Sequence, residues 1–178
     1  MELVDLGPCT AFWSEAGQRT AVLLPGRSGG ALQPALTYLR ELLVGLGWSV
    51  LAVHDEFRSG DHRGWPRERL RAAAAFREPQ LVVGKSMATF AAAVVEVPAV
   101  WLTPLLHEPD VRDGIRPPAL LVGGTADPSW DRDAARGLGV DVLELEGVDH
   151  GLVVSGDPHA SLDAMRRLVD GVAAFVER

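Results

Sequence analysis

The residue best suited to catalysis is Ser86, which lies in a Gly84-x-Ser86-x-Ala88 pattern. An aliphatic run precedes the pattern at residues 81–83 and an alanine-rich stretch follows it, so we expect the serine on a sharp turn between a strand and a helix. Small residues at positions 84 and 88 suit the place where this helix and strand would cross closely. A serine hydroxyl is a weak nucleophile until a base removes its proton. The stretch therefore predicts a nucleophilic serine only if a base and an acid lie nearby.

An acid and a base that would complete this chemistry follow two later predicted strands. Asp127 ends the stretch Gly-Gly-Thr-Ala-Asp, and His150 lies in the stretch Gly-Val-Asp-His-Gly. The carboxyl ends of parallel strands meet at one edge of a sheet, so we expect both side chains there, together with Ser86. His150 would take the proton of Ser86, while Asp127 would hold the imidazole in the right tautomer and stabilise its charged form.

Each of these residues also has a purely structural interpretation. Ser86 could cap the helix that follows it, and Asp127 could cap a helix that begins near Pro128. His150 could be a histidine of a surface loop. Asp149 is a rival acid, but it directly precedes His150 and is expected to point away from it. The interpretation as a reaction centre depends on the three residues being found together.

The elements that must position these residues alternate along the chain. Apolar runs predict six strands, at residues 20–24, 48–53, 81–83, 99–102, 119–122 and 140–145. Amphipathic or alanine-rich segments predict helices at residues 32–46, 67–76, 86–95, 131–138 and 158–176. Strands that alternate with helices favour a parallel sheet, and strands that are apolar throughout favour one covered on both faces. Residues 3–6 and 10–13 could add an antiparallel hairpin at one edge.

The order Ser–Asp–His, with each residue after a strand, resembles the α/β-hydrolase family, in particular its small esterases and dienelactone hydrolases. The resemblance runs from about residue 20 to the end of the chain. It implies one α/β domain over residues 1–178, a three-layer sandwich with helices on both faces of a mostly parallel sheet of about six strands. Residues 103–116 leave room for one short helix, so we expect no lid domain and a shallow, open site.

The oxyanion of a tetrahedral intermediate needs hydrogen-bond donors. The backbone N–H of Met87 is one candidate, at the start of a helix whose dipole also favours negative charge. The resemblance places the second donor in the loop after the first parallel strand, where the N–H of Arg27 or that of Ser28 could serve. The expected pocket residues are Gly26, Ser28, Phe57, Leu105, Leu106, His107 and Trp130. For His107, and for His54, a solvated loop position is the alternative.

Composition narrows the classes of protein further. The chain has 178 residues, 47% of them hydrophobic, which suits one domain. Its net charge of −7 disfavours nucleic acid as a partner. Cys9 is the only cysteine, so we expect neither a disulfide nor a thiolate metal site. The longest apolar region, residues 90–102, is broken by Glu96 and Pro98, and no signal peptide is visible. We therefore expect a cytoplasmic protein with no membrane partner.

These observations predict a serine hydrolase that cleaves small carboxylic esters or thioesters through an acyl-Ser86 intermediate. Such a reaction needs neither a cofactor nor a metal. The sequence leaves the oligomeric state open. It also leaves two alternatives open, because a fold does not dictate its function. One is a non-catalytic binding or regulatory module, and the other is an acyltransferase or a peptidase on the same fold.

Overall fold

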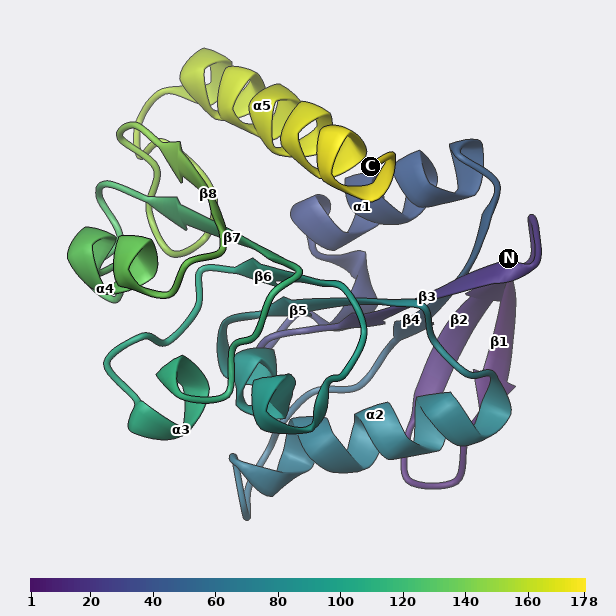
Figure 1. The fold of residues 1–178 in the computed structure, drawn as a ribbon. Coiled ribbons are helices and arrows are strands. Elements are labelled where there is room, and N and C mark those ends of the chain that lie inside the picture. The colour runs from purple at the N-terminus through teal and green to yellow at the C-terminus, as the bar shows by residue number, and fades with distance from the viewer.

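An eight-stranded sheet forms the centre of the molecule in a computed structural model that describes residues 1–178 (Figure 1). The spatial order of the strands is β1-β2-β4-β3-β5-β6-β7-β8. Their bounds are β1 (Glu2–Asp5), β2 (Thr10–Ser14), β3 (Arg19–Leu24), β4 (Trp48–Val53), β5 (Leu81–Lys85), β6 (Ala99–Leu102), β7 (Ala119–Gly124) and β8 (Asp141–Leu145). The six strands from β3 to β8 are parallel, whereas β1 and β2 form a hairpin that pairs antiparallel with β4. The predicted parallel sheet with an antiparallel N-terminal edge is confirmed.

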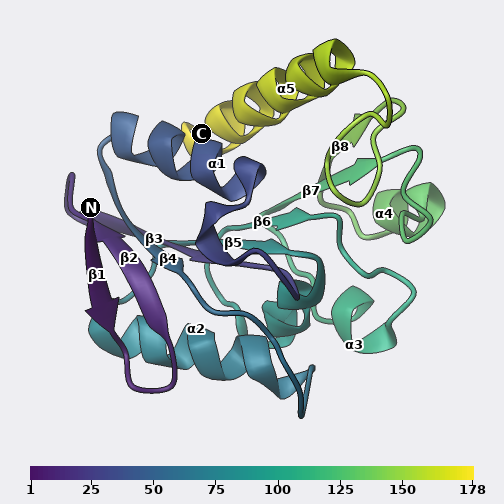
Figure 2. The ribbon, with the colours of Figure 1, turned by 180° about the vertical axis from the view of Figure 1, so that it is seen from behind.

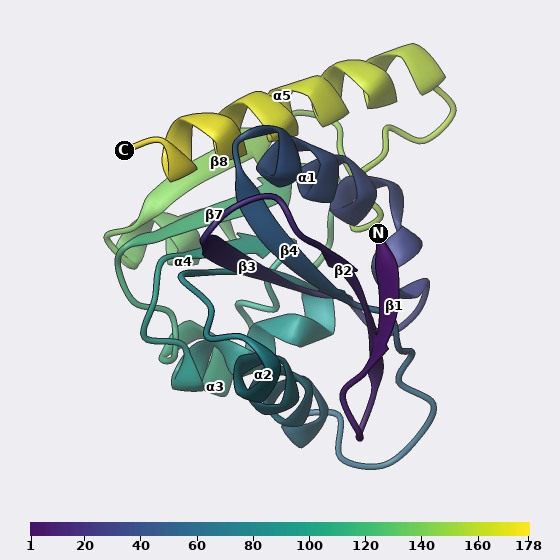
Figure 3. The same cartoon turned by 90° about the vertical axis from the view of Figure 1, so that its right-hand side faces the viewer.

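Helices cover both faces of the sheet, which gives three layers (Figures 1 and 3). One face carries the 3₁₀ helix η1 (Gly30–Leu32), α1 (Pro34–Gly45) and α5 (Pro158–Val176). The opposite face carries α2 (Gly64–Phe76), the 3₁₀ helix η2 (Ser86–Val94), α3 (Pro109–Arg112) and α4 (Arg132–Gly137). Seen from behind, the β1–β2 hairpin lies at one edge of the sheet and β8 at the other (Figure 2).

The apolar side chains pack into two separate cores, one on each face of the sheet. Each core holds 23 buried hydrophobic residues, so the two faces are covered equally. In β3, Val22 and Leu24 point to the face of α2, while Ala21 and Leu23 point to the face of α1. Each such leucine or valine stabilises the fold by about 1.5–3 kcal/mol relative to an exposed side chain. Two-sided burial explains why the strand sequences are apolar without alternation.

Three helices differ in type, or by more than one residue in their bounds, from what was predicted, and α4 is one residue shorter at each end than the predicted 131–138. The helix predicted at residues 32–46 begins as the turn η1 and becomes α-helical at Pro34, because proline suits the first position of a helix. The helix predicted at residues 67–76 begins earlier, at Gly64. The segment predicted at residues 86–95 winds as the 3₁₀ helix η2. A 3₁₀ helix is narrower than an α-helix, which suits the close crossing over β5.

The strand order reverses direction at β3. From β3 the chain first adds β4 on one side of this strand and then adds β5 on its other side. Open α/β sheets bind ligands at such a switch point, outside the carboxyl ends of the strands. Between β6 and β7 the only helix is the four-residue α3, so no lid covers this edge. None of the helices is long and apolar enough to cross a membrane.

Candidate active site

Ser86 stands on a strained turn directly after β5. Its φ angle of 52° lies in the left-handed region, which costs a residue other than glycine on the order of 1–3 kcal/mol. The surroundings hold it there. A Cβ atom on Gly84 would lie 2.5 Å from the Trp101 ring, and one on Gly26 would lie 3.4 Å from Cβ of Ser86. The two glycines therefore allow β5, the loop after β3 and the start of η2 to approach one another closely.

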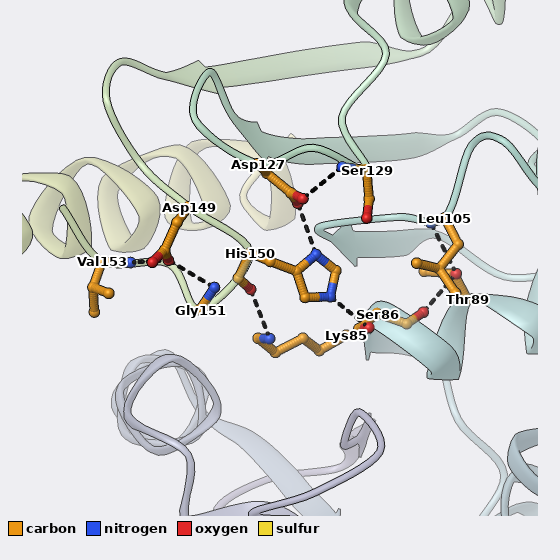
Figure 4. A network of polar contacts seen from close by, with 10 residues as sticks. All are labelled: Lys85, Ser86, Thr89, Leu105, Asp127, Ser129, Asp149, His150, Gly151 and Val153. Carbon is orange, nitrogen blue, oxygen red and sulfur yellow. Dashed lines mark hydrogen bonds and ion pairs between the residues drawn. The ribbon is translucent and has the colours of Figure 1, made fainter. Parts of the chain in front are cut away.

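A chain of two hydrogen bonds joins Ser86, His150 and Asp127 (Figure 4). Oγ of Ser86 lies 2.7 Å from Nε2 of His150, and Nδ1 of the same ring lies 2.8 Å from Oδ2 of Asp127. The three side chains come from the ends of β5, β7 and β8, as the strand-end argument predicts. This arrangement can take a proton from the serine hydroxyl and stabilise the imidazolium that results.

The carboxylate of Asp127 is shielded from solvent. Its side chain is fully buried, and Oδ1 accepts a hydrogen bond of 2.8 Å from the N–H of Ser129. The turn itself is closed by a bond from the N–H of Asp127 to the carbonyl of Gly124. The N–H of Ala126 donates to the carbonyl of Val148, which links this turn to the loop that carries the histidine. Asp127 can therefore orient His150 with little freedom to move.

His150 lies on the loop between β8 and α5, with its side chain 37% exposed. The neighbouring Asp149 turns away from the imidazole, and its Oδ1 accepts bonds from the N–H groups of Gly151 and Val153 at 2.7 and 3.2 Å. The N–H of Gly147 donates to Oγ1 of Thr125. Asp149 therefore shapes the loop, and its carboxylate makes no bond to the ring.

A hollow of about 420 Å³ opens beside Ser86. Four residues predicted for the oxyanion site or the pocket line it, namely Arg27, Phe57, Met87 and Leu105. The carbonyl of Arg27 accepts a 3.1 Å bond from the N–H of Phe57, which fixes the loop after β3 against the loop after β4. The residues that the sequence analysis missed are Arg58, Ser59, Gly60, His62, Phe90 and Glu108. The rule that loops after parallel strands line the site could have found five of these, because the first four follow β4 and Glu108 follows β6.

Other residues predicted for the pocket lie elsewhere. Leu106 is only 1% exposed and belongs to the core. Trp130 packs over Gly123 and donates to Glu144, and it borders an open polar depression together with His107. Neither side chain lines the hollow beside Ser86, and the Trp130 ring lies back over β7 and β8, against Gly123 and Glu144.

A second hollow of about 360 Å³ is lined in part by His150. Ser28 lines it, together with Lys85, His150 and Gly151. Ser28 thus lies apart from the hollow beside Ser86, whereas Arg27 borders that hollow. His54 is half-buried against the ring of Phe12. No cluster of three or more histidine, cysteine, aspartate or glutamate side chains could hold a metal ion.

The sequence matches no protein-family model and no curated protein. Solved structures are similar to it. Est1E from Butyrivibrio proteoclasticus, with ferulic acid bound, is 12% identical over 100% of both chains, with a TM-score of 0.73. A serine hydrolase without lid from Xanthomonas campestris is 20% identical over 90% of this chain and 83% of that one, with a TM-score of 0.69. A dienelactone hydrolase from Anabaena variabilis is 16% identical over 95% and 94%, with a TM-score of 0.70.

These similarities extend over nearly the whole length of each chain, although few residues are identical. They establish the fold. The chain has the α/β-hydrolase fold in its form without a lid, as found in small serine hydrolases, esterases and dienelactone hydrolases. The resemblance stated from the sequence is confirmed at this level.

Proposed function

We propose that this protein is a serine hydrolase that cleaves small carboxylic esters or thioesters through an acyl-Ser86 intermediate. The observation that carries the proposal is the unbroken chain of hydrogen bonds from Ser86 through His150 to Asp127, at 2.7 and 2.8 Å. Serine, histidine and a buried carboxylate in this geometry are the requirements of nucleophilic acyl transfer. The esterases and serine hydrolases that share the fold support the same reaction class.

The reaction would proceed in two halves. Oγ of Ser86 attacks the carbonyl carbon while Nε2 of His150 takes its proton, and the imidazolium then gives that proton to the departing alcohol or thiol. In the second half, His150 activates a water molecule that attacks the acyl-enzyme, and the serine hydroxyl is regenerated. Asp127 keeps a proton on Nδ1 of the histidine and stabilises its positive charge.

The negative oxygen of each tetrahedral intermediate would be held by backbone N–H groups. Met87 supplies one, since it follows the nucleophile at the start of η2 and lines the hollow. Arg27 is the better candidate for the second, because it lines the same hollow while Ser28 lines the other one. No cofactor takes part in this scheme.

The shape of the site favours small substrates. The hollow beside Ser86 measures about 420 Å³, is open to solvent, and has Phe57, Phe90 and Leu105 among its walls. Ligand pockets of about 300–1,000 Å³ hold small molecules, so this one suits a short aliphatic or single-ring acyl group. The structural relative with ferulic acid bound holds an acid of that size.

The proposal is tested with p-nitrophenyl acetate and butyrate and with the variant Ser86→Ala. We expect turnover to fall by roughly 10³-fold or more, because the nucleophile is lost, while the circular dichroism spectrum stays unchanged. A fluorophosphonate probe should label the wild-type protein once, and mass spectrometry should place the adduct on Ser86. Ser59 is the internal control, since it lines the same hollow but makes no hydrogen bond to a histidine.

Three outcomes would contradict parts of this proposal. Wild-type turnover in Ser86→Ala would exclude the serine as nucleophile. No turnover and no labelling in the wild-type protein would favour a binding module on this fold. If an added alcohol or amine captured most of the acyl group in place of water, the protein would be an acyltransferase.

A further inference from the structure

Lys85, the only lysine of the chain, occupies an unusual place between the sheet and the site. It is the last residue of β5 and directly precedes Ser86. Side chains alternate along a strand, so Lys85 points to the same face as Leu81 and Val83, which pack in the core beneath α1 and α5. From that face its side chain reaches up beside the loop that carries His150 (Figure 4).

Burial of this charged side chain costs free energy, because the ammonium group loses contact with water. Lys85 is only 7% exposed, and lysine is rarely buried unless it is paired. None of the ion pairs of the molecule includes it. Burial lowers the pKa of its ammonium group, while the carboxylates of Asp127 and Asp149 act in the opposite direction. The cost of burying this ammonium group must therefore be offset by the contacts of its nitrogen atom.

The nitrogen of Lys85 has one protein partner, the backbone carbonyl of His150. Nζ donates to this oxygen at 3.1 Å across 65 positions of sequence. It is the only hydrogen bond that the main chain of His150 makes in the structure. Asp127 holds the imidazole at Nδ1, and Lys85 holds the backbone carbonyl of the same residue.

We propose that Lys85 is a positioning residue, which fixes the backbone of His150 relative to Ser86. Lys85 is also joined to Ser86 by a peptide bond at the end of β5. One residue therefore contacts the backbone of both partners of the proton transfer, Ser86 and His150. Displacement of a catalytic group by about 1 Å can cost roughly 10²-fold in rate. The inference rests on the proposed function, because it concerns the same serine and histidine.

The variant Lys85→Met tests the inference, since it keeps a flexible apolar stem and removes the donor. We expect kcat for p-nitrophenyl butyrate to fall roughly 10- to 100-fold. KM should stay within about threefold, because Lys85 does not line the hollow beside Ser86. The matched control is Arg40→Met, which removes another buried cation whose contacts are with Glu41 and Met1. Its kcat should stay within about twofold of wild type.

Restoring the donor should restore the rate. Lys85→Arg keeps a cationic donor, and chemical rescue of Lys85→Cys is the closer mimic. There, 2-bromoethylamine is attacked by the new thiolate, bromide leaves, and an aminoethyl thioether of lysine length forms. The alkylation is carried out on urea-unfolded protein, which is then refolded, because a thiol buried at position 85 would stay protonated near pH 8.5, just as burial raises the pKa of the Cys9 thiol to about 11. The variant also carries Cys9→Ala, so that only position 85 is alkylated, and Cys9→Ala protein treated in the same way is the control.

The outcomes separate this inference from the proposed function. Loss in Lys85→Met with recovery in Lys85→Arg or in the aminoethylated variant supports it. Wild-type kcat in Lys85→Met, a loss confined to KM, or equal loss without recovery by either donor would overturn it. If Ser86→Ala is inactive while Lys85→Met turns over normally, only the positioning role fails. If Ser86→Ala stays active, the proposed function itself fails.

Discussion

Two regions at the same edge of the sheet differ sharply in how they are held. The turn after β7, residues 124–129, carries Asp127, whose side chain is fully buried and bonded to both Ser129 and His150. The loop after β4, residues 54–63, borders the hollow beside Ser86 with Phe57, Arg58 and neighbouring residues. From position 58 to position 62 this loop is mostly exposed and contains no helix or strand.

The difference separates two tasks. The groups proposed for the chemistry sit at strand ends, where backbone hydrogen bonds and burial leave them little freedom. The groups proposed to meet the substrate sit on a surface loop, where side chains contact solvent and tolerate change. Substitutions in the turn after β7 should therefore change kcat, and substitutions in the loop after β4 should change KM and the preference for acyl length.

The largest effect is expected in the turn after β7, from Asp127→Asn. The new carbonyl can still accept from the N–H of Ser129, so the amide nitrogen would face Nδ1 of His150. This favours the wrong tautomer of the imidazole, and kcat for p-nitrophenyl butyrate should fall roughly 10²- to 10⁴-fold. Circular dichroism and thermal unfolding check that the variant is folded. A kcat within tenfold of wild type would contradict the role assigned to Asp127.

A smaller effect is expected in the loop after β4, from Phe57→Ala. The Phe57 ring packs edge-on against Trp65 and lines the hollow, so its loss should weaken contact with the acyl chain. KM for p-nitrophenyl butyrate should rise about four- to fifteenfold, as expected for one or two methylene groups that lose about 0.8 kcal/mol each. The rise should be smaller for the acetate ester, and kcat should stay within about threefold.

The matched control for this variant is Phe76→Ala. Phe76 also makes an edge-on aromatic contact, with Trp13, but it lies at the end of α2 and lines no part of the hollow. It should leave both kinetic constants unchanged. A large fall in kcat in Phe57→Ala, with KM unchanged for both esters, would contradict the division between the two regions.

The same contrast explains what the sequence could predict. Strands are visible as apolar runs, and the residue after each parallel strand must lie at the carboxyl edge of the sheet. Ser86, Asp127 and His150 could therefore be placed together from sequence alone, and the structure brings them into hydrogen-bonding contact. The possible antiparallel hairpin is also present, with its first strand shifted by one residue from the expected 3–6 and its second one residue longer than the expected 10–13.

The walls of the hollow were harder to predict, because a loop has no periodicity that fixes the direction of its side chains. Leu105 and Leu106 were both expected in the pocket, yet adjacent residues point in different directions, and only Leu105 lines it. Trp130 was also expected there. A Cβ atom on Gly123 would overlap the ring of Trp130, so the absence of a side chain at that position lets the ring fold back over β7.

The smallest effect is expected from Asp149→Asn, which tests which acid serves His150. Oδ1 of Asp149 accepts from the N–H groups of Gly151 and Val153, and an amide oxygen at this position can still accept both bonds. We expect kcat within about threefold of wild type, since no bond to the imidazole is changed. Asp149→Ala would lose both loop bonds at about 1 kcal/mol each and should lower Tm by several degrees. If Asp149→Asn instead lost as much activity as Asp127→Asn, the carboxylate that serves the histidine would be Asp149, on its own loop, and the buried turn after β7 would have only a structural role.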